Sequence, residues 1–134
     1  MRRSLLVVGL VAVLIVLALA LARFVRRRIS PHKYVERWQD LQRFCASKET
    51  WPLAIISADK LLDEALKNKH LKGKSMGERL VSAQRILSDN DSVWFSHNLA
   101  KKLIEEATVR LNQTDVKKSL LGVRQALKDL GVMQ

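Results

Sequence analysis

The chain has 134 residues and a mass of 15.3 kDa, with 24 Lys and Arg residues against 13 Asp and Glu residues and a net charge of +11. This length fits one small domain with an appendage, and a hydrophobic content of 48% excludes a wholly disordered chain. The single cysteine, Cys45, excludes an intramolecular disulfide and a zinc site built from several cysteines.

The first predicted element is a transmembrane anchor with a basic flank, in residues 1–28. The run Leu5–Ala22 holds eighteen consecutive uncharged residues. As a helix it is roughly 27 Å long, close to the bilayer hydrocarbon thickness of about 30 Å. A cleavable secretory signal is the alternative, because two arginines precede the run and Ala18-Leu19-Ala20 has the form of a cleavage site. The run is longer than a usual signal core and arginines follow it, so we favour an uncleaved anchor.

The positive charges on either side of this run predict its orientation. Two arginines precede it, whereas six Lys and Arg residues follow it through residue 37. The side richer in positive charge stays in the cytoplasm. We therefore expect a single-pass protein of the inner (cell) membrane, with the N-terminus outside and the remaining chain in the cytoplasm. Side chains of the basic flank are expected to contact anionic lipid headgroups: Arg23, Arg26, Arg27, Arg28 and Lys33.

The chain beyond the anchor has helical periodicity without a strand pattern, which predicts an all-α fold. Residues 29–49 are expected to hold a juxtamembrane amphipathic helix over about 31–47, which either packs on the next domain or acts as a stalk. Residues 50–134 are expected to form an antiparallel, up-down four-helix bundle, because the connections are short. Its helices are expected at about 50–69, from 75, at 92–111 and from 114.

Capping residues predict where these helices begin and end. Thr50 and Thr114 are candidate N-caps, and Ser75-x-x-Glu78 has the spacing of a capping box. Gly131 follows the last predicted helix, where a left-handed residue commonly ends a helix.

The residue pattern indicates no catalytic group, cofactor or metal site. The three histidines lack the spacing of metal ligands, and the sequence has no Gly-rich nucleotide-binding loop. His97 lies on the apolar side of the helix predicted at 92–111, so a buried, hydrogen-bonded histidine is expected there. The apolar positions of that helix are Val93, Trp94, His97, Ala100, Leu103, Ile104 and Ala107.

Other reactive or aromatic side chains are expected to have structural roles. Cys45 lies on the apolar stripe of the helix at 31–47 and is expected to be buried. The adjacent acidic residues Asp63 and Glu64 are expected to lie on solvated faces. The three tryptophans are expected to pack within the fold rather than stack on nucleic-acid bases: Trp38, Trp51 and Trp94.

The charge of the predicted bundle gives a second hypothesis. Residues 50–134 carry only +4 of the net charge, which argues against a broad nucleic-acid footprint. The basic segment 67–79 nevertheless offers a local surface for RNA or a nucleotide. Its cationic side chains are Lys67, Lys69, Lys72, Lys74 and Arg79.

Two segments of the predicted bundle, Ser92–Glu106 and Val116–Gly131, resemble helices of the HEPN superfamily (higher eukaryotes and prokaryotes nucleotide-binding). Shorter similarities at 58–63 and 73–80 extend the resemblance to about residues 50–131. It implies a helical bundle with a tendency to form dimers.

The same resemblance implies that nuclease activity is missing. Active members of this family carry an Arg, a polar residue and, shortly after, a His, and the matching positions here are Ala100, Lys101 and Glu105. A methyl group cannot bind phosphate and a carboxylate repels it, so acid–base cleavage would lack its main groups. The spacing recurs at Arg27 and His32, beside the membrane and outside the bundle.

The sequence therefore predicts a single-pass membrane protein with a non-catalytic cytoplasmic bundle for protein–protein interaction. Its expected partners are the lipid bilayer and a protein of unknown identity, with a homodimer as one form of that interaction. The alternative is a membrane-tethered binder of RNA or nucleotides that uses the segment 67–79.

Overall fold

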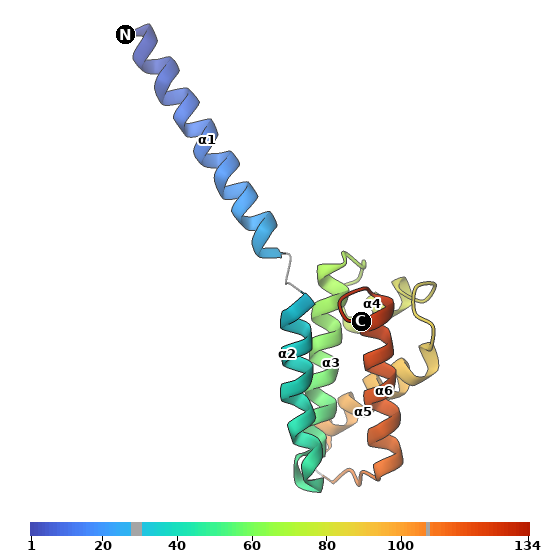
Figure 1. Cartoon of the computed structure of the whole chain (residues 1–134). Helices are drawn as coiled ribbons and strands as arrows, with labels where there is room; N and C mark the ends of the chain where they lie inside the picture. Colours follow the sequence, from blue (N-terminus) through green and yellow to red (C-terminus); the bar gives the residue numbers. More distant parts are fainter. Residues whose placement is uncertain (28–30, 107) are drawn as a thin grey trace.

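The computed structural model describes residues 1–27, 31–106 and 108–134, apart from the side chains of 24–27 and 31, and these ranges are helical without a strand (Figure 1). Residues Arg28 and Ala107, for which a headgroup contact and an inward position are predicted, lie outside the described residues. The elements in chain order are α1 (Arg2–Arg27), α2 (Pro31–Gln42), the 3-10 helices η1 (Arg43–Ala46) and η2 (Lys48–Thr50), α3 (Trp51–Asn68), α4 (Met76–Ser82), α5 (Asn90–Glu105) and α6 (Gln113–Asp129).

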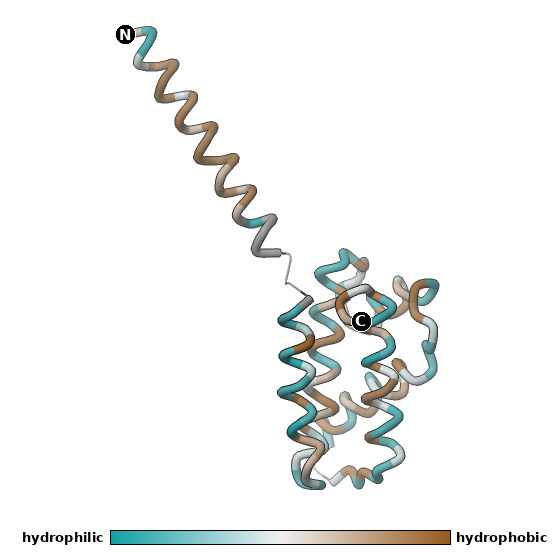
Figure 2. Tube along the Cα trace, viewed as in Figure 1, coloured by the Kyte–Doolittle hydropathy of each residue, from teal (hydrophilic) through white to brown (hydrophobic). Residues whose placement is uncertain are grey.

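The N-terminal helix α1 is long and apolar enough to cross a membrane. Its segment Arg2–Arg23 has 22 residues and a mean hydropathy of 3.3, and none of its most apolar window is buried against the rest of the chain. Figure 2 shows hydrophobic residues along almost the whole described length of this helix. A signal sequence near an N-terminus passes the same test of length and composition, so these two properties do not distinguish it from a membrane anchor.

Helix α3 is the central element of the bundle. It packs against α2, α4, α5 and α6, while α5 and α6 also pack against each other. Its apolar stripe supplies Ala58, Leu62, Ala65 and Leu66 to one core, at the spacing of a single helix face.

Helix α2 joins this core through one face and runs antiparallel to α3. Tyr34, Trp38 and Leu41 are buried at i, i+4 and i+7, and the Asn68 side chain donates a hydrogen bond of 2.7 Å to the Tyr34 hydroxyl. The first turn of α2 therefore lies beside the last turn of α3. Of the two predicted arrangements for this helix, the structure has the packed one.

Three helices end earlier than the sequence predicts. The helix predicted from residue 75 to carry Leu87 on its inner face ends at Ser82 in α4. Helix α2 ends at Gln42 because the chain then tightens into η1, and the Thr50 hydroxyl and Trp51 indole donate to the carbonyls of Phe44 and Cys45. Thr50 thus does not cap α3 with its side chain, although it is the residue before that helix.

Helix α5 ends at Glu105 rather than near residue 111, and the next N-cap also differs from the prediction. Asn112, not Thr114, caps α6, by accepting a hydrogen bond from the Asp115 amide. A helix through residue 111 would leave no chain for the reversal before Asn112. Ile104, predicted to face inward, is 64% exposed.

Ser75 caps α4 as predicted, although the reciprocal bond of Glu78 goes to the residue before the N-cap, and Gly131 ends α6 as predicted. The Ser75 hydroxyl accepts a hydrogen bond from the Glu78 amide, while the Glu78 carboxylate accepts from the Lys74 amide. Gly131 has a φ of 76°, and the amide of Val132 donates to the carbonyl of Leu127, as in a Schellman motif.

Helices α5 and α6 approach closely at Gly122. A Cβ atom at this position would lie 2.7 Å from the Ser92 Cβ and 3.0 Å from the Ser92 carbonyl carbon. Fully buried Ser96 and Ser119 keep this interface narrow with small side chains. Small residues at this interface therefore allow α5 and α6 to pack closely.

We expect Gly122→Ala to lower the free energy of unfolding by about 1–3 kcal/mol, because the added methyl group overlaps backbone atoms of α5. Urea unfolding followed by circular dichroism measures this loss. The matched control is Gly77→Ala in α4, where the nearest atom to the new Cβ is 3.7 Å away, in ordinary contact with Trp94. An equal loss in both variants would contradict the close approach.

Candidate protein-interaction groove

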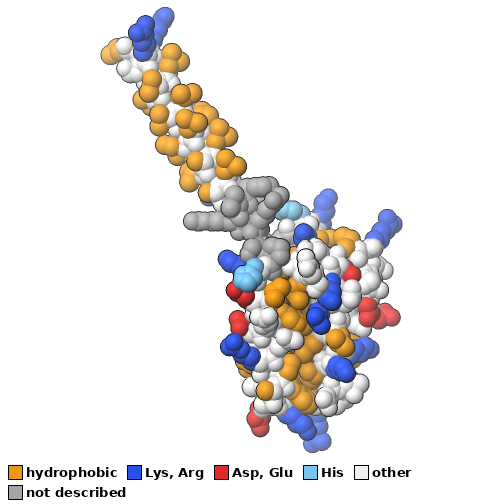
Figure 3. Space-filling view, in the orientation of Figure 1, with side chains coloured by type: hydrophobic (Ala, Val, Ile, Leu, Met, Phe, Trp, Pro, Cys, Tyr) orange, Lys and Arg blue, Asp and Glu red, His pale blue; other side chains and the backbone are white. Residues whose placement is uncertain are grey.

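A groove of about 420 Å³ lies between α2 and α6. Both helices pack on α3, but the extensive packing of α6 is with α3 and α5 and not with α2. In Figure 3, hydrophobic side chains gather in the hollow between these two helices. The groove therefore forms because α2 packs on α3 and leaves the facing side of α6 uncovered.

Aromatic and aliphatic side chains form most of the lining. Trp38 from α2, Trp51 from the start of α3, and Val116, Leu120 and Leu121 from α6 all line it. Leu121 is 53% exposed, although it belongs to a helix with a well-buried opposite face. Trp38 is buried and Trp51 is half-buried. Exposed apolar surface next to aromatic rings is typical of binding sites for other proteins.

The charges that line the groove have one sign. Lys117 and Arg124 on α6 are exposed and lie at its edge, and the remaining polar lining is the neutral Gln42 and Gln113. Burial raises the pKa of the Cys45 thiol, so this side chain lines the groove as a neutral group. The prediction of a fully buried Cys45 is wrong, because η1 turns it to the edge of the core, where it is half-buried.

One buried donor at the groove lacks a partner within the described part of the chain. Trp38 is only 5% exposed, and its indole N–H makes no hydrogen bond to the described residues. A buried donor without an acceptor is unfavourable by about 1–3 kcal/mol.

Two further hollows among the described residues differ from this groove. A hollow of about 240 Å³ on the opposite flank of α2 is lined by charges of both signs, Arg37 and Asp40. A shallow hollow over the first turns of α6 shares Gln113, Lys117 and Leu121 with the groove, and so extends it.

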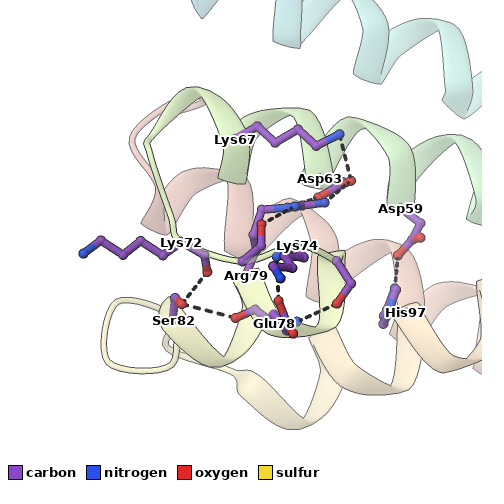
Figure 4. A network of polar contacts seen from close by, with 11 residues as sticks. Asp59, Asp63, Lys67, Lys72, Lys74, Glu78, Arg79, Ser82 and His97 are labelled. Atoms are coloured by element: carbon purple, nitrogen blue, oxygen red, sulfur yellow. Dashed lines mark hydrogen bonds and ion pairs between the residues drawn. The ribbon is translucent and has the colours of Figure 1, made fainter.

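A polar network on the other side of α3 fixes the connection to α4 (Figure 4). The Arg79 guanidinium donates to both carboxylate oxygens of Asp63, at 2.7 and 2.9 Å, and to the Gly73 carbonyl at 2.9 Å. Lys67 also lies 3.5 Å from this carboxylate. The sequence predicts that Asp63 lies on a solvated face. In the structure its carboxylate instead neutralises the buried Arg79 guanidinium.

Arg79 is consequently the one member of the predicted basic surface whose side chain is buried, at 7% exposure for the residue. Its guanidinium is committed to Asp63 and Gly73, so it is not presented to a phosphate in solution. Exposed lysines of the same segment are Lys67, Lys69, Lys72 and Lys74.

His97 is buried and hydrogen-bonded, as the sequence predicts. Its Nδ1 lies 3.0 Å from an oxygen of Asp59 on α3, and its ring packs edge-on against Trp94 with 6.0 Å between centroids. Burial raises the pKa of Asp59, while the hydrogen bond and charge of His97 oppose that rise. The pair has the polar chemistry of a catalytic dyad, but the described residues bring no nucleophile into contact with it.

The residues predicted to contact lipid headgroups lie at the anchor end of the chain. Arg23 and Lys33 are exposed on α1 and on the first turn of α2. The backbone of Arg26 and Arg27 belongs to α1, but their side chains are outside the described residues. Among the described residues, no group of three His, Cys, Asp or Glu side chains is placed to hold a metal ion.

The groove itself was not predicted from the sequence. Leu121 was the available signal, since it interrupts the polar face of α6 with an apolar residue. Trp38 and Trp51 were predicted to pack, but their convergence with α6 depends on tertiary contacts.

No family model, curated protein or solved structure matches this chain.

The buried pair provides a pH-dependent test. Because burial raises the pKa of Asp59, the folded protein holds this proton more tightly than the unfolded chain, and the contribution of Asp59 to stability falls as pH rises above the ordinary value of 3.8. We expect the stability of Asp59→Asn relative to the wild type to increase as the pH rises above about 4.

Urea unfolding at several pH values measures this difference. Asn98→Ala, an exposed neutral change beside His97, is the control and should differ from the wild type by the same amount at every pH. A constant difference for Asp59→Asn as well would show that the carboxyl is not perturbed by its surroundings.

Proposed function

We propose that this protein is a single-pass membrane protein that holds a non-catalytic helical bundle at the cytoplasmic face and uses the α2–α6 groove to bind an acidic amphipathic helix of a partner protein. The observation that carries this proposal is the apolar groove with Lys117 and Arg124 at its edge.

The membrane part of the proposal is supported by α1 and its flanks. A helix with a mean hydropathy of 3.3 and no burial against the chain has no apolar environment other than a lipid bilayer. The excess of positive charge after α1 favours a cytoplasmic bundle in the inner membrane and an outer N-terminus.

The partner's chemistry follows from the walls of the groove. Two helices and the start of α3 enclose a long apolar depression, which suits the apolar face of a third helix. Lys117 and Arg124 would lie beside the polar face of that helix, so Glu or Asp residues there are favoured and Lys or Arg residues are disfavoured.

We also propose that the bundle is a HEPN-like fold without nuclease activity. Ala100, at the position of the family's arginine, is fully buried against α3. Lys101 and Glu105, at the polar and histidine positions, are exposed on the same helix. These placements support a role in binding rather than cleavage.

The proposal can be tested with two model peptides that share one apolar helical face, one with glutamates and the other with lysines on the polar face. The full chain in zwitterionic nanodiscs is titrated with each peptide, and tryptophan fluorescence reports binding because Trp38 and Trp51 line the groove. We expect tighter binding of the glutamate peptide, and an inversion of this preference in the double variant Lys117→Glu/Arg124→Glu.

A matched pair of variants tests the apolar contact. Leu121→Glu places a charge in the groove, and Ile104→Glu places the same charge at a similarly exposed position outside its lining. Because both side chains are at least half exposed, both variants should stay folded. We expect at least a tenfold loss of glutamate-peptide affinity for Leu121→Glu, about 1.4 kcal/mol, and little change for Ile104→Glu.

Three results would contradict this function. Equal affinity for both peptides would remove the charge argument, and equal effects of the two glutamate variants would remove the groove. Self-association of the wild type that Leu121→Glu abolishes would identify a second copy of the chain as the occupant instead.

A further inference from the structure

The structure brings a set of lysines from the α3–α4 connection to the end of the bundle next to the membrane anchor. Only residues 28–30 separate α1 from α2, so the first residue of α2 lies within about 14 Å of the last residue of α1. The Asn68–Tyr34 hydrogen bond places the last turn of α3 beside the first turns of α2. In Figure 1 the α3–α4 connection lies at this same end of the bundle.

The backbone of this connection is fixed by the polar network shown in Figure 4. Ser82 donates to the Lys72 carbonyl at 2.6 Å, Arg79 donates to the Gly73 carbonyl, and the Lys74 amide donates to Glu78. Leu71 packs against the core on one side of the connection. The lysines of this connection are therefore carried on an ordered backbone.

Their ammonium groups remain available while the neighbouring carboxylates are engaged. Lys69, Lys72 and Lys74 are exposed and form no ion pair with the described residues, and Figure 4 shows the Lys72 side chain extending away from the network. Three acidic side chains at this end pair with cationic groups or histidine: Glu36 with His32, Asp63 with Arg79 and Lys67, and Glu64 with Arg37. The Glu78 carboxylate accepts a hydrogen bond from the Lys74 amide.

We infer that Lys69, Lys72 and Lys74 form a lipid-facing surface that binds anionic headgroups of the membrane crossed by α1. Each lysine near an anionic leaflet gains an attraction that decays over about one Debye length, so proximity to the anchor decides whether this attraction matters. The anchor holds this end of the bundle near the bilayer continuously, whereas a nucleic acid would have to compete for the same narrow, three-lysine surface. This inference rests on the membrane anchor of the proposed function but not on the groove.

The surface would give the bundle a preferred orientation on the membrane. With the first turn of α2 and the α3–α4 connection both at the bilayer, the helix axes point away from it and the groove between α2 and α6 opens sideways. A partner helix would then reach the groove without displacing lipid.

The test uses lysine footprinting of the full wild-type chain in vesicles. A membrane-impermeant acylating reagent labels exposed amines, and mass spectrometry of peptides gives the labelling rate at each lysine. Vesicles contain either phosphatidylcholine alone or phosphatidylcholine with about one-third phosphatidylglycerol, an amount that makes the surface strongly anionic. Lys101 and Lys102 are the internal control, because they follow Ala100, which packs beside Ile55 at the opposite end of α3.

We expect labelling of Lys69, Lys72 and Lys74, relative to Lys101 and Lys102, to be about fivefold slower on the anionic vesicles, and to recover at high salt. Equal relative rates on the two vesicles would overturn the inference. Protection by added RNA on zwitterionic vesicles, without protection by phosphatidylglycerol, would assign the surface to nucleic acid and also overturn it.

Flotation of the same samples separates this inference from the proposed function. A chain that does not float with either vesicle lacks the anchor, and the proposed function fails together with this inference. A chain that floats with both vesicles and shows equal labelling rates loses only the lipid-facing surface.

Discussion

The packing of α2 on α3 is the contact on which both candidate surfaces depend. Tyr34, Trp38 and Leu41 insert one face of α2 into the core that it shares with α3, α5 and α6. This contact makes α2 a wall of the groove, and its antiparallel sense brings the α3–α4 connection to the anchor end. A boundary drawn at residue 50 would cut through that core, so α2 and the helices after it form one packed unit.

Buried charge in this protein has a structural explanation. Asp59 and Asp63 lie one helical turn apart on α3 and face different partners, the imidazole of His97 and the guanidinium of Arg79. Both carboxylates satisfy groups that come from other helices, and Arg79 also holds the chain segment before α4 through Gly73. Removing one member of such a pair would leave the other buried without its partner, which is far less favourable than losing a surface ion pair. The network therefore supports the shape of the lysine-bearing connection rather than chemistry of its own.

The fold class and most helix positions could be predicted from the sequence because they depend on local signals. Apolar periodicity, the Ser75 capping box and Gly131 each act within a few residues, and the structure confirms them. The helix ends at Gln42 and Glu105 depend instead on where the chain must reverse to pack, which no local pattern records.

The candidate sites were harder to predict for the same reason. In the sequence Arg79 is one more basic residue beside the neighbouring lysines. Only its tertiary contact with Asp63 shows that it is buried. Likewise Trp38, Trp51 and Leu121 are distant in sequence, and they line one groove because α2 and α6 flank the same helix.

The two walls of the groove are attached unequally to the rest of the bundle. Helix α6 is locked to α5 through the close approach at Gly122, whereas α2 has extensive packing with α3 and η1 but with neither α5 nor α6. A change in the width of the groove would therefore disturb the α2–α3 contact before it disturbed the α5–α6 pair.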